Sequence, residues 1–144
     1  MTPSEAARQR VQASFDRQGM MRHMGARLLQ ASPGLCEVAL PYSDRVTQQQ
    51  GGFHGGAMGA LADIAGGYAA LTVAPEGMEV TTVEYKINFL SSKQQGELRA
   101  VGKVVKGGKR IIVTTAEVFH IDAQGQQTLC AVMQQTLVPV AQIY

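Results

Sequence analysis

Residues 54–73 read HGGAMGALADIAGGYAALTV. The larger apolar side chains in this stretch recur at helical period, and small residues fill most other positions. The apolar stripe consists of Met58, Leu61, Ala62, Ala65, Ala69 and Thr72. A helix that is apolar nearly all round lies inside a protein. Pro75 and Gly77 follow, and proline disfavours the helical conformation in the residue before it. We therefore predict one central buried helix over residues 55–73.

Extended segments follow this helix and predict an antiparallel sheet. In the first, residues 81–90, apolar side chains alternate with Glu84, Lys86 and Asn88, as they do in a half-buried strand. The later segments are rich in Val, Ile and Thr and cover residues 97–106, 109–121 and 128–140. Turn residues join them at 94–96, 107–108 and 122–126, which indicates an antiparallel meander.

The region before the central helix predicts further elements of the same domain. Residues 26–32 and 35–40 are extended and separated by Pro33-Gly34, which indicates a hairpin. Residues 4–18 carry apolar side chains at helical spacing and predict a short amphipathic helix. We expect a single domain over residues 1–144, with residues 1–24 as a helical segment packed on it. One buried helix and one sheet imply an α+β fold in which the sheet curls around the helix.

Composition excludes several classes of protein. The chain of 144 residues is 45% hydrophobic and 17% charged, as in ordinary globular domains. A net charge of +2, 6% aromatic residues and no Trp argue against nucleic acid as a partner. No apolar stretch is long enough to span a membrane and no secretory signal begins the chain, so we expect a cytoplasmic protein. Cys36 and Cys130 stand far apart without a CxxC pattern and are expected to be buried thiols.

The two glycines at the start of the predicted helix suggest an anion-binding position. The first N–H groups of a helix have no partner within the helix, and Gly55 and Gly56 let a substrate oxygen approach them closely. Such donors stabilise the oxyanion of an acyl-transfer reaction. The alternative is that the glycines only permit a tight turn into the helix. His54, taken alone, is more often a hydrogen-bonded structural residue than a catalytic one.

Asp63 strengthens the catalytic interpretation. Aspartate is a poor helix former, and burying its charge among apolar neighbours is costly unless the charge has a role. We expect it to act as a base or nucleophile; the alternative is a structural carboxylate that pairs with a backbone or arginine group. Small residues share its face of the helix and would admit a second subunit or an acyl chain: Gly59, Ala60, Gly66, Gly67 and Ala70.

The spacing between His54 and Asp63 has a consequence for the site. Nine residues of straight helix rise about 13 Å, so the two ends of this segment cannot reach the same carbonyl. In a symmetric dimer with antiparallel helices, the Gly55 N–H of one subunit would face the Asp63 carboxylate of the other. We therefore predict a homodimer with two composite active sites.

These residues also carry a family resemblance. Gln48, His54-Gly55-Gly56 and Asp63, followed by the segments 87–91 and 106–110, resemble the PaaI-type hotdog-fold acyl-CoA thioesterases. The resemblance covers residues 35–140. It implies a long central helix wrapped by a curved antiparallel sheet, a homodimer that often pairs into a tetramer, and hydrolysis of acyl-CoA without metal or other cofactor.

The resemblance also implies roles for single residues. Asp63 would be general base or nucleophile, and Gly55 would supply the oxyanion-hole N–H, with His54 and Gln48 aligning the thioester. Thr82, or less directly Thr81, would be the hydroxyl residue that positions water on the strand after the helix. Gly56 and Asn88 are expected to contact the substrate.

A basic stretch supports an anionic ligand. Seven basic residues and one acid, Glu97, lie between residues 86 and 110. Lys106, Lys109 and Arg110 flank the Gly-Gly turn and are candidates for binding the phosphates of coenzyme A. The alternative is that these side chains only point into solvent.

Other functions find less support in the sequence. The three histidines lack metal-ligand spacing, 107–110 lacks the P-loop pattern, and no GxSxG occurs. A non-catalytic acyl-CoA-binding module and a hydratase remain as alternatives, although hydratases arrange their acid differently. Phe53, Met58, Tyr85 and Phe89 suit an aromatic or an aliphatic acyl group, so the acyl specificity stays open.

Overall fold

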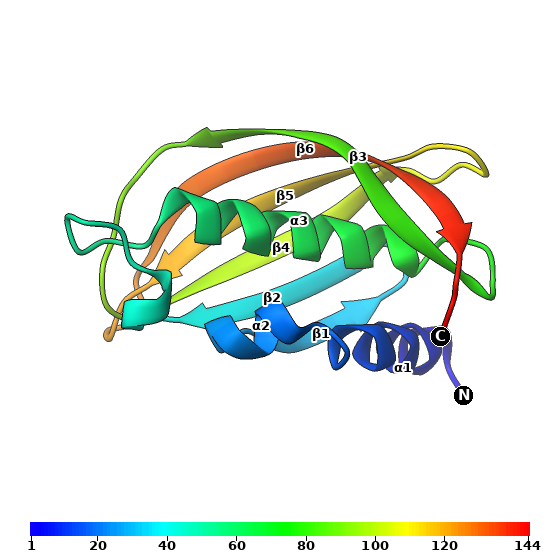
Figure 1. Ribbon diagram of the computed structural model, residues 1–144, viewed down its shortest axis with the longest axis horizontal. Coiled ribbons are helices and arrows are strands. Elements are labelled where there is room, and N and C mark those ends of the chain that lie inside the picture. The colour runs from blue at the N-terminus through cyan, green and yellow to red at the C-terminus, as the bar shows by residue number, and fades with distance from the viewer.

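One six-stranded antiparallel sheet curls around a long central helix (Figure 1). The computed structural model describes all residues, 1–144. The central helix, α3, spans Gly55–Leu71 and ends close to where the sequence predicted. The strands are β1 (Arg27–Ser32), β2 (Leu35–Pro41), β3 (Met78–Phe89), β4 (Glu97–Lys106), β5 (Ile112–Ile121) and β6 (Gln127–Ala141). The α+β fold and the hairpin of β1 and β2 are thus confirmed.

The strand order corrects one prediction. It is β1-β2-β4-β5-β6-β3, so a meander joins β4, β5 and β6 but β3 is not part of it. The partner of β4 on its other side is β2, which pairs with it from Leu35↔Lys103 to Pro41↔Glu97. Because that side of β4 is occupied, β3 pairs instead with β6. The strand that follows the central helix therefore forms an edge of the sheet.

Two helices, rather than the single predicted one, precede the sheet. The first, α1 (Pro3–Phe15), begins with a capping box between Thr2 and Glu5, and its Arg8 Nη1 donates to the Leu29 carbonyl at 2.7 Å. It stops at Phe15, and a short second helix, α2 (Gly19–Met24), follows. Both lie beside β1 at the edge opposite β3 (Figure 1). None of the helices combines the length and the apolarity needed to cross a bilayer.

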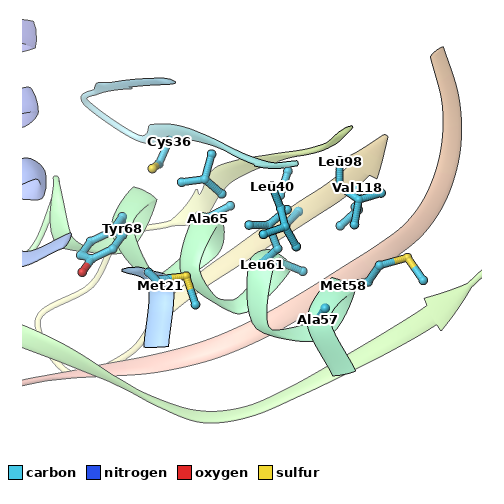
Figure 2. Close-up of a cluster of buried hydrophobic side chains, with 14 of the residues drawn as sticks. Met21, Cys36, Leu40, Ala57, Met58, Leu61, Ala65, Tyr68, Leu98 and Val118 are labelled. Atoms are coloured by element: carbon cyan, nitrogen blue, oxygen red, sulfur yellow. The ribbon is translucent and has the colours of Figure 1, made fainter. Parts of the chain in front are cut away.

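The core lies between α3 and the concave face of the sheet. Leu61 of α3 and Leu40 of β2 lie together in it and are fully buried (Figure 2). Gly102 on β4 allows the helix to approach, because a Cβ there would overlap the Ala65 carbonyl oxygen. Cys36 and Cys130 are buried free thiols, as expected, and burial raises the pKa of Cys36 to about 12.

The edge strand β3 is more exposed than its pattern predicted. The alternation indicated a half-buried strand, but Val83, Tyr85 and Phe89 are 61%, 44% and 51% exposed. Of the four apolar residues in the pattern, only Ile87 is half-buried. The reason is the strand order, since β3 has β6 on one side and no strand on the other. The chain therefore presents an apolar strand edge to its surroundings.

Candidate active site

The start of α3 leaves one backbone donor free. His54 is the N-cap residue, and its Nδ1 accepts a hydrogen bond from the Gly56 N–H at 2.7 Å. Gly56 has to be glycine for this geometry, because a Cβ there would lie 2.9 Å from His54 Nδ1. The Gly55 N–H donates to no acceptor within the chain. The cap thus uses the second N–H of the helix and leaves the first available, as an anion-binding position requires.

A groove of about 390 Å³ opens beside Gly55. Gln48 and Phe89 line it together with Gly55, so the structure brings three of the predicted residues to one hollow. A Cβ at Gly55 would lie 3.4 Å from the Phe89 ring, an ordinary van der Waals distance. The backbone of Gln48 closes the preceding loop, donating to the Gly52 carbonyl at 2.9 Å and accepting from the Gly51 N–H at 3.0 Å. We call this hollow the helix-start groove.

Asp63 lies in the middle of α3 and is half-buried rather than fully buried. Its Oδ1 accepts a hydrogen bond from the Thr82 hydroxyl at 2.7 Å and another from Gln135 Nε2. Its Oδ2 accepts no hydrogen bond from the protein. Thr82, rather than Thr81, is therefore the hydroxyl residue that contacts the carboxylate. One oxygen of Asp63 is fixed and the other is free to meet a ligand.

Gln135 of β6 was not predicted from the sequence. It is 1% exposed, and its Nε2 also donates to Thr82 Oγ1 at 2.9 Å. Its Oε1 accepts from the hydroxyl of Thr114 on β5 at 2.9 Å. A signal was present, because Gln135 is the polar member of an inward-facing series on β6 that includes Met133 and Leu137. A glutamine at a core position of a strand needs partners for its amide.

The free side of Asp63 faces a second hollow, which we call the Asp63 cavity. Its volume is about 370 Å³, and its lining includes Asp63, Thr82, Tyr68 and Glu79. The Tyr68 hydroxyl accepts from Gln18 Nε2 at 2.7 Å, and burial raises the pKa of Tyr68 to about 12. Tyr68 therefore stays protonated and neutral at physiological pH. The cavity thus has one carboxylate positioned by the fold and a largely polar wall.

The helix-start groove and the Asp63 cavity share no lining residue. Tyr85 separates them, since a Cβ at Gly59 would lie 3.1 Å from the Tyr85 hydroxyl. Sheet side chains of the same chain also cover Gly66, where a Cβ would overlap Gln135 Oε1. Gly59 and Gly66 therefore make room for side chains of the chain's own sheet, whereas Gly67 of the same strip lines the Asp63 cavity. A single chain holds two separate halves of the predicted site.

The remaining candidates lie away from both hollows. Asn88 accepts a hydrogen bond from Lys86 Nζ at 2.8 Å, is exposed and lines neither hollow. Lys106, Lys109 and Arg110 are exposed around the turn between β4 and β5. That turn adjoins the C-terminal end of α3, where a Cβ at Gly107 would lie 3.4 Å from Val73 Cγ2. Within one chain, the basic turn and the helix-start groove are thus at opposite ends of α3.

Comparisons with known proteins point to one family. The sequence profile of the thioesterase superfamily matches residues 50–125, which include Gly55 and Asp63. A putative esterase of Saccharolobus solfataricus is 35% identical over 107 residues, 74% of each chain. The crystal structure of a thioesterase family protein from Silicibacter pomeroyi is 36% identical, with a TM-score of 0.89 over 93% of this chain and 98% of that one. The PaaI protein of E. coli shares the fold, with a TM-score of 0.84 at 21% identity and 97% coverage of both chains.

Proposed function

The chain belongs to the thioesterase superfamily and is a thioester hydrolase of the hotdog fold, and we propose that it hydrolyses an acyl-CoA to a free acid and CoA in a site shared between two subunits. The observation that carries the proposal is the pair of separate hollows along α3. One offers an unpaired N–H at Gly55, and the other offers an unpaired carboxylate oxygen at Asp63. Thioester hydrolysis needs both kinds of group, a donor for the oxyanion and a base or nucleophile for the carbonyl.

At Asp63 the free oxygen does the chemistry. As general base, Oδ2 takes a proton from water while the water oxygen bonds to the thioester carbonyl carbon. The C–S bond then breaks, and CoA leaves as a thiolate that takes up a proton. As nucleophile, Oδ2 itself bonds to the carbonyl carbon, and the C–S bond breaks with release of CoA as a thiolate that takes up a proton. Water then hydrolyses the resulting anhydride to the free acid and regenerates the Asp63 carboxylate. The Thr82 hydroxyl at 2.7 Å holds Oδ1 in both routes, which leaves Oδ2 turned to the cavity.

At Gly55 the backbone N–H receives the carbonyl oxygen. The donor is fixed before the reaction, because the His54 cap and the helix that follows hold it in place. A fixed dipole needs no rearrangement as negative charge develops, which is why such donors contribute strongly to acyl transfer. Gln48 lines the same groove and is proposed to orient the thioester beside Gly55.

A symmetric dimer would bring the two halves together. The exposed edge of β3 supports this arrangement, since Val83, Tyr85 and Phe89 present apolar side chains beside unpaired backbone groups. Pairing two β3 edges about a twofold axis runs the two α3 helices antiparallel, so that the Gly55 end of one meets the middle of the other. Pairing of such dimers into a tetramer stays a prediction.

The basic turn fits the same assembly. Antiparallel helices bring the C-terminal end of one α3 toward the N-terminal end of the other. Lys106, Lys109 and Arg110 of one subunit would then lie on the side of the partner's helix-start groove, where the phosphates of a bound CoA thioester need cations.

The test is release of free thiol from a panel of acyl-CoA esters by wild type and Asp63→Asn. The asparagine keeps the size of the side chain but cannot act as a base. We expect wild type to turn over at least one acyl-CoA and Asp63→Asn to lose about 10²-fold or more in kcat. Tight binding of acyl-CoA without turnover by wild type would instead identify a binding module. Turnover by Asp63→Asn at the wild-type rate would remove Asp63 from the mechanism.

A further inference from the structure

The buried glutamine behind Asp63 has no role in the chemistry described so far. Gln135 and Thr114 are 1% and 0% exposed, and both lie between α3 and the sheet. Their neighbours on the same strands and face are apolar, among them Ala116, Met133 and Leu137. A buried polar pair is rarely the most stabilising choice at such a place, since apolar residues of the same shape pack there at equal or lower cost.

The hydrogen bonds of this pair run from Thr114 through Gln135 to Asp63. Thr114 Oγ1 donates to Gln135 Oε1 at 2.9 Å. Gln135 Nε2 then donates to Asp63 Oδ1 and to Thr82 Oγ1, the latter at 2.9 Å, and also lies 3.3 Å from the Asp63 carbonyl oxygen. An ionised carboxylate only accepts hydrogen bonds, so the amide group of Gln135 has to face Asp63 with its nitrogen. Thr114 fixes that orientation, because its hydroxyl occupies the carbonyl side of the amide.

The central helix is shaped to admit this network. A Cβ at Gly66 would overlap Gln135 Oε1 and lie 2.7 Å from Thr114 Oγ1. Glycine inside a helix costs stability relative to alanine. Gly66 nevertheless lies in α3 about one turn after Asp63, at the position where the side chain of Gln135 packs against the helix. No buried side-chain N or O atom in the protein lacks a partner, so the network is complete without any ligand.

We propose that Gln135, oriented by Thr114, is a positioning residue that fixes Asp63 Oδ1 and turns Oδ2 toward the substrate. This inference rests on the proposed function, in which Asp63 is the reacting carboxylate. Gln135 does not itself contact the Asp63 cavity, whose lining does not include it. It acts through Asp63 Oδ1, which it shares with Thr82 as a donor.

One property follows for catalysis. Fixing one oxygen of Asp63 orients the other, so loss of the hydrogen bond lowers kcat more than it changes KM. The other titratable groups that line the cavity are Tyr68 on α3 and Glu79 on β3; Ser14 of α1 and Gln18, the N-cap residue of α2, add neutral polar groups. All four stay in every variant tested.

The experiment measures kcat and KM of thiol release for wild type, Gln135→Met, Gln135→Glu and Thr114→Val. Methionine matches the length of glutamine without its amide; we expect kcat to fall about 10- to 100-fold and KM to change less than about threefold. Gln135→Glu places a second carboxyl group beside Asp63 in place of the donor, and kcat is expected to fall further than in Gln135→Met. Thr114→Val removes only the orienting donor and is expected to cost about threefold in kcat.

Thr115→Val is the matched control, because the adjacent side chain lies on the other face of β5 and outside the network. It should keep the wild-type kcat and KM. Thermal unfolding of each variant separates lost stability from lost positioning. If Gln135→Met folds and keeps the wild-type kcat, the inference is wrong although the proposed function stands. If Gln135→Met does not fold, Thr114→Val decides, and an unchanged kcat there rejects the inference. Wild-type activity in Asp63→Asn would instead remove Asp63 from the mechanism, and no turnover of any acyl-CoA by wild type would reject the proposed function.

Discussion

The first turn of α3 and its middle offer a substrate different kinds of group. At Gly55 the group is a backbone N–H, left free because His54 caps the neighbouring N–H. At Asp63 it is a side-chain oxygen, left free because Thr82 and Gln135 hold the other oxygen. Neither half needs a charged partner. The donor is made by local backbone geometry, and the acceptor is made by contacts between distant segments.

This difference predicts which substitutions remove the donor at Gly55 and which remove the acceptor at Asp63. A backbone donor survives any side-chain change except proline, and a side-chain acceptor can be removed by an isosteric amide. The following four changes test this contrast, in order of expected effect.

Gly55→Pro should abolish the donor without unfolding the helix. Gly55 is the first helical residue, where proline is favoured, and His54 has φ −67° and ψ 136°, a conformation that a residue before proline adopts readily. Gly55→Ala adds a Cβ at the same place but keeps the N–H. We expect kcat of the proline variant to lie about 10²- to 10³-fold below that of the alanine variant. Equal rates for the two would show that this N–H does not hold the oxyanion.

Mixed dimers of Asp63→Asn and Gly55→Pro should recover activity. In a composite site, each mixed dimer has one site with both groups intact and one with neither. Refolding the two inactive variants together at equal amounts gives mixed dimers as half of all dimers, so about a quarter of the wild-type activity should return. Each variant refolded alone is the control. No recovery, with mixed dimers detected by mass, would place both groups of a site in one chain.

Val83→Lys should weaken dimerisation. Val83 is a bulge residue on the edge strand and 61% exposed, and a lysine on a strand edge opposes pairing. Val105→Lys is a closely matched control, since Val105 is also a bulge residue and is 64% exposed, but on the interior strand β4. Analytical ultracentrifugation should show a dissociation constant raised about tenfold or more for Val83→Lys alone, with activity falling in parallel. Equal self-association of the two variants would point to another interface.

Charge reversal at the basic turn should have the smallest effect. The double variant Lys109→Glu and Arg110→Glu is expected to raise KM for acyl-CoA about 3- to 10-fold and to leave kcat unchanged, because exposed ion pairs contribute little each. A pantetheine thioester lacks the nucleotide phosphates and should be unaffected. Lys103→Glu reverses an exposed charge on β4 outside the turn and serves as the control. An equal rise of KM for both substrates would argue against phosphate contact.

Much of the fold followed from local patterns. The period of the central helix, the alternation in the strands and the glycine turns predicted the elements near their observed bounds. The place of β3 was not predictable in this way, because its alternation is the same whether it pairs with β4 or with β6. That choice depends on the pairing of β2 with β4, a contact between segments far apart in the sequence.

In the candidate site too, the residues that depend on local sequence were predictable, and those that depend on strand pairing were not. His54, Gly55 and Asp63 stood out because glycines at a helix start and an aspartate inside an apolar helix are unusual locally. Thr82 was uncertain beside Thr81 until the bulge in β3 set which hydroxyl meets the carboxylate. Gln135 is the polar member of an apolar series on β6, but one glutamine in a strand is ordinary until the inward face of that strand is known.

The sequence by itself determined the central helix, its unpaired first N–H and the carboxylate two turns along, because helix geometry depends on residues a few positions apart. It also set the separation of the two groups, since the rise of a helix per residue is fixed. Only the tertiary structure decided what surrounds them: the free edge of β3, and the network of Thr82, Thr114 and Gln135 at Asp63. Those features come from strands that meet only when the sheet closes around the helix.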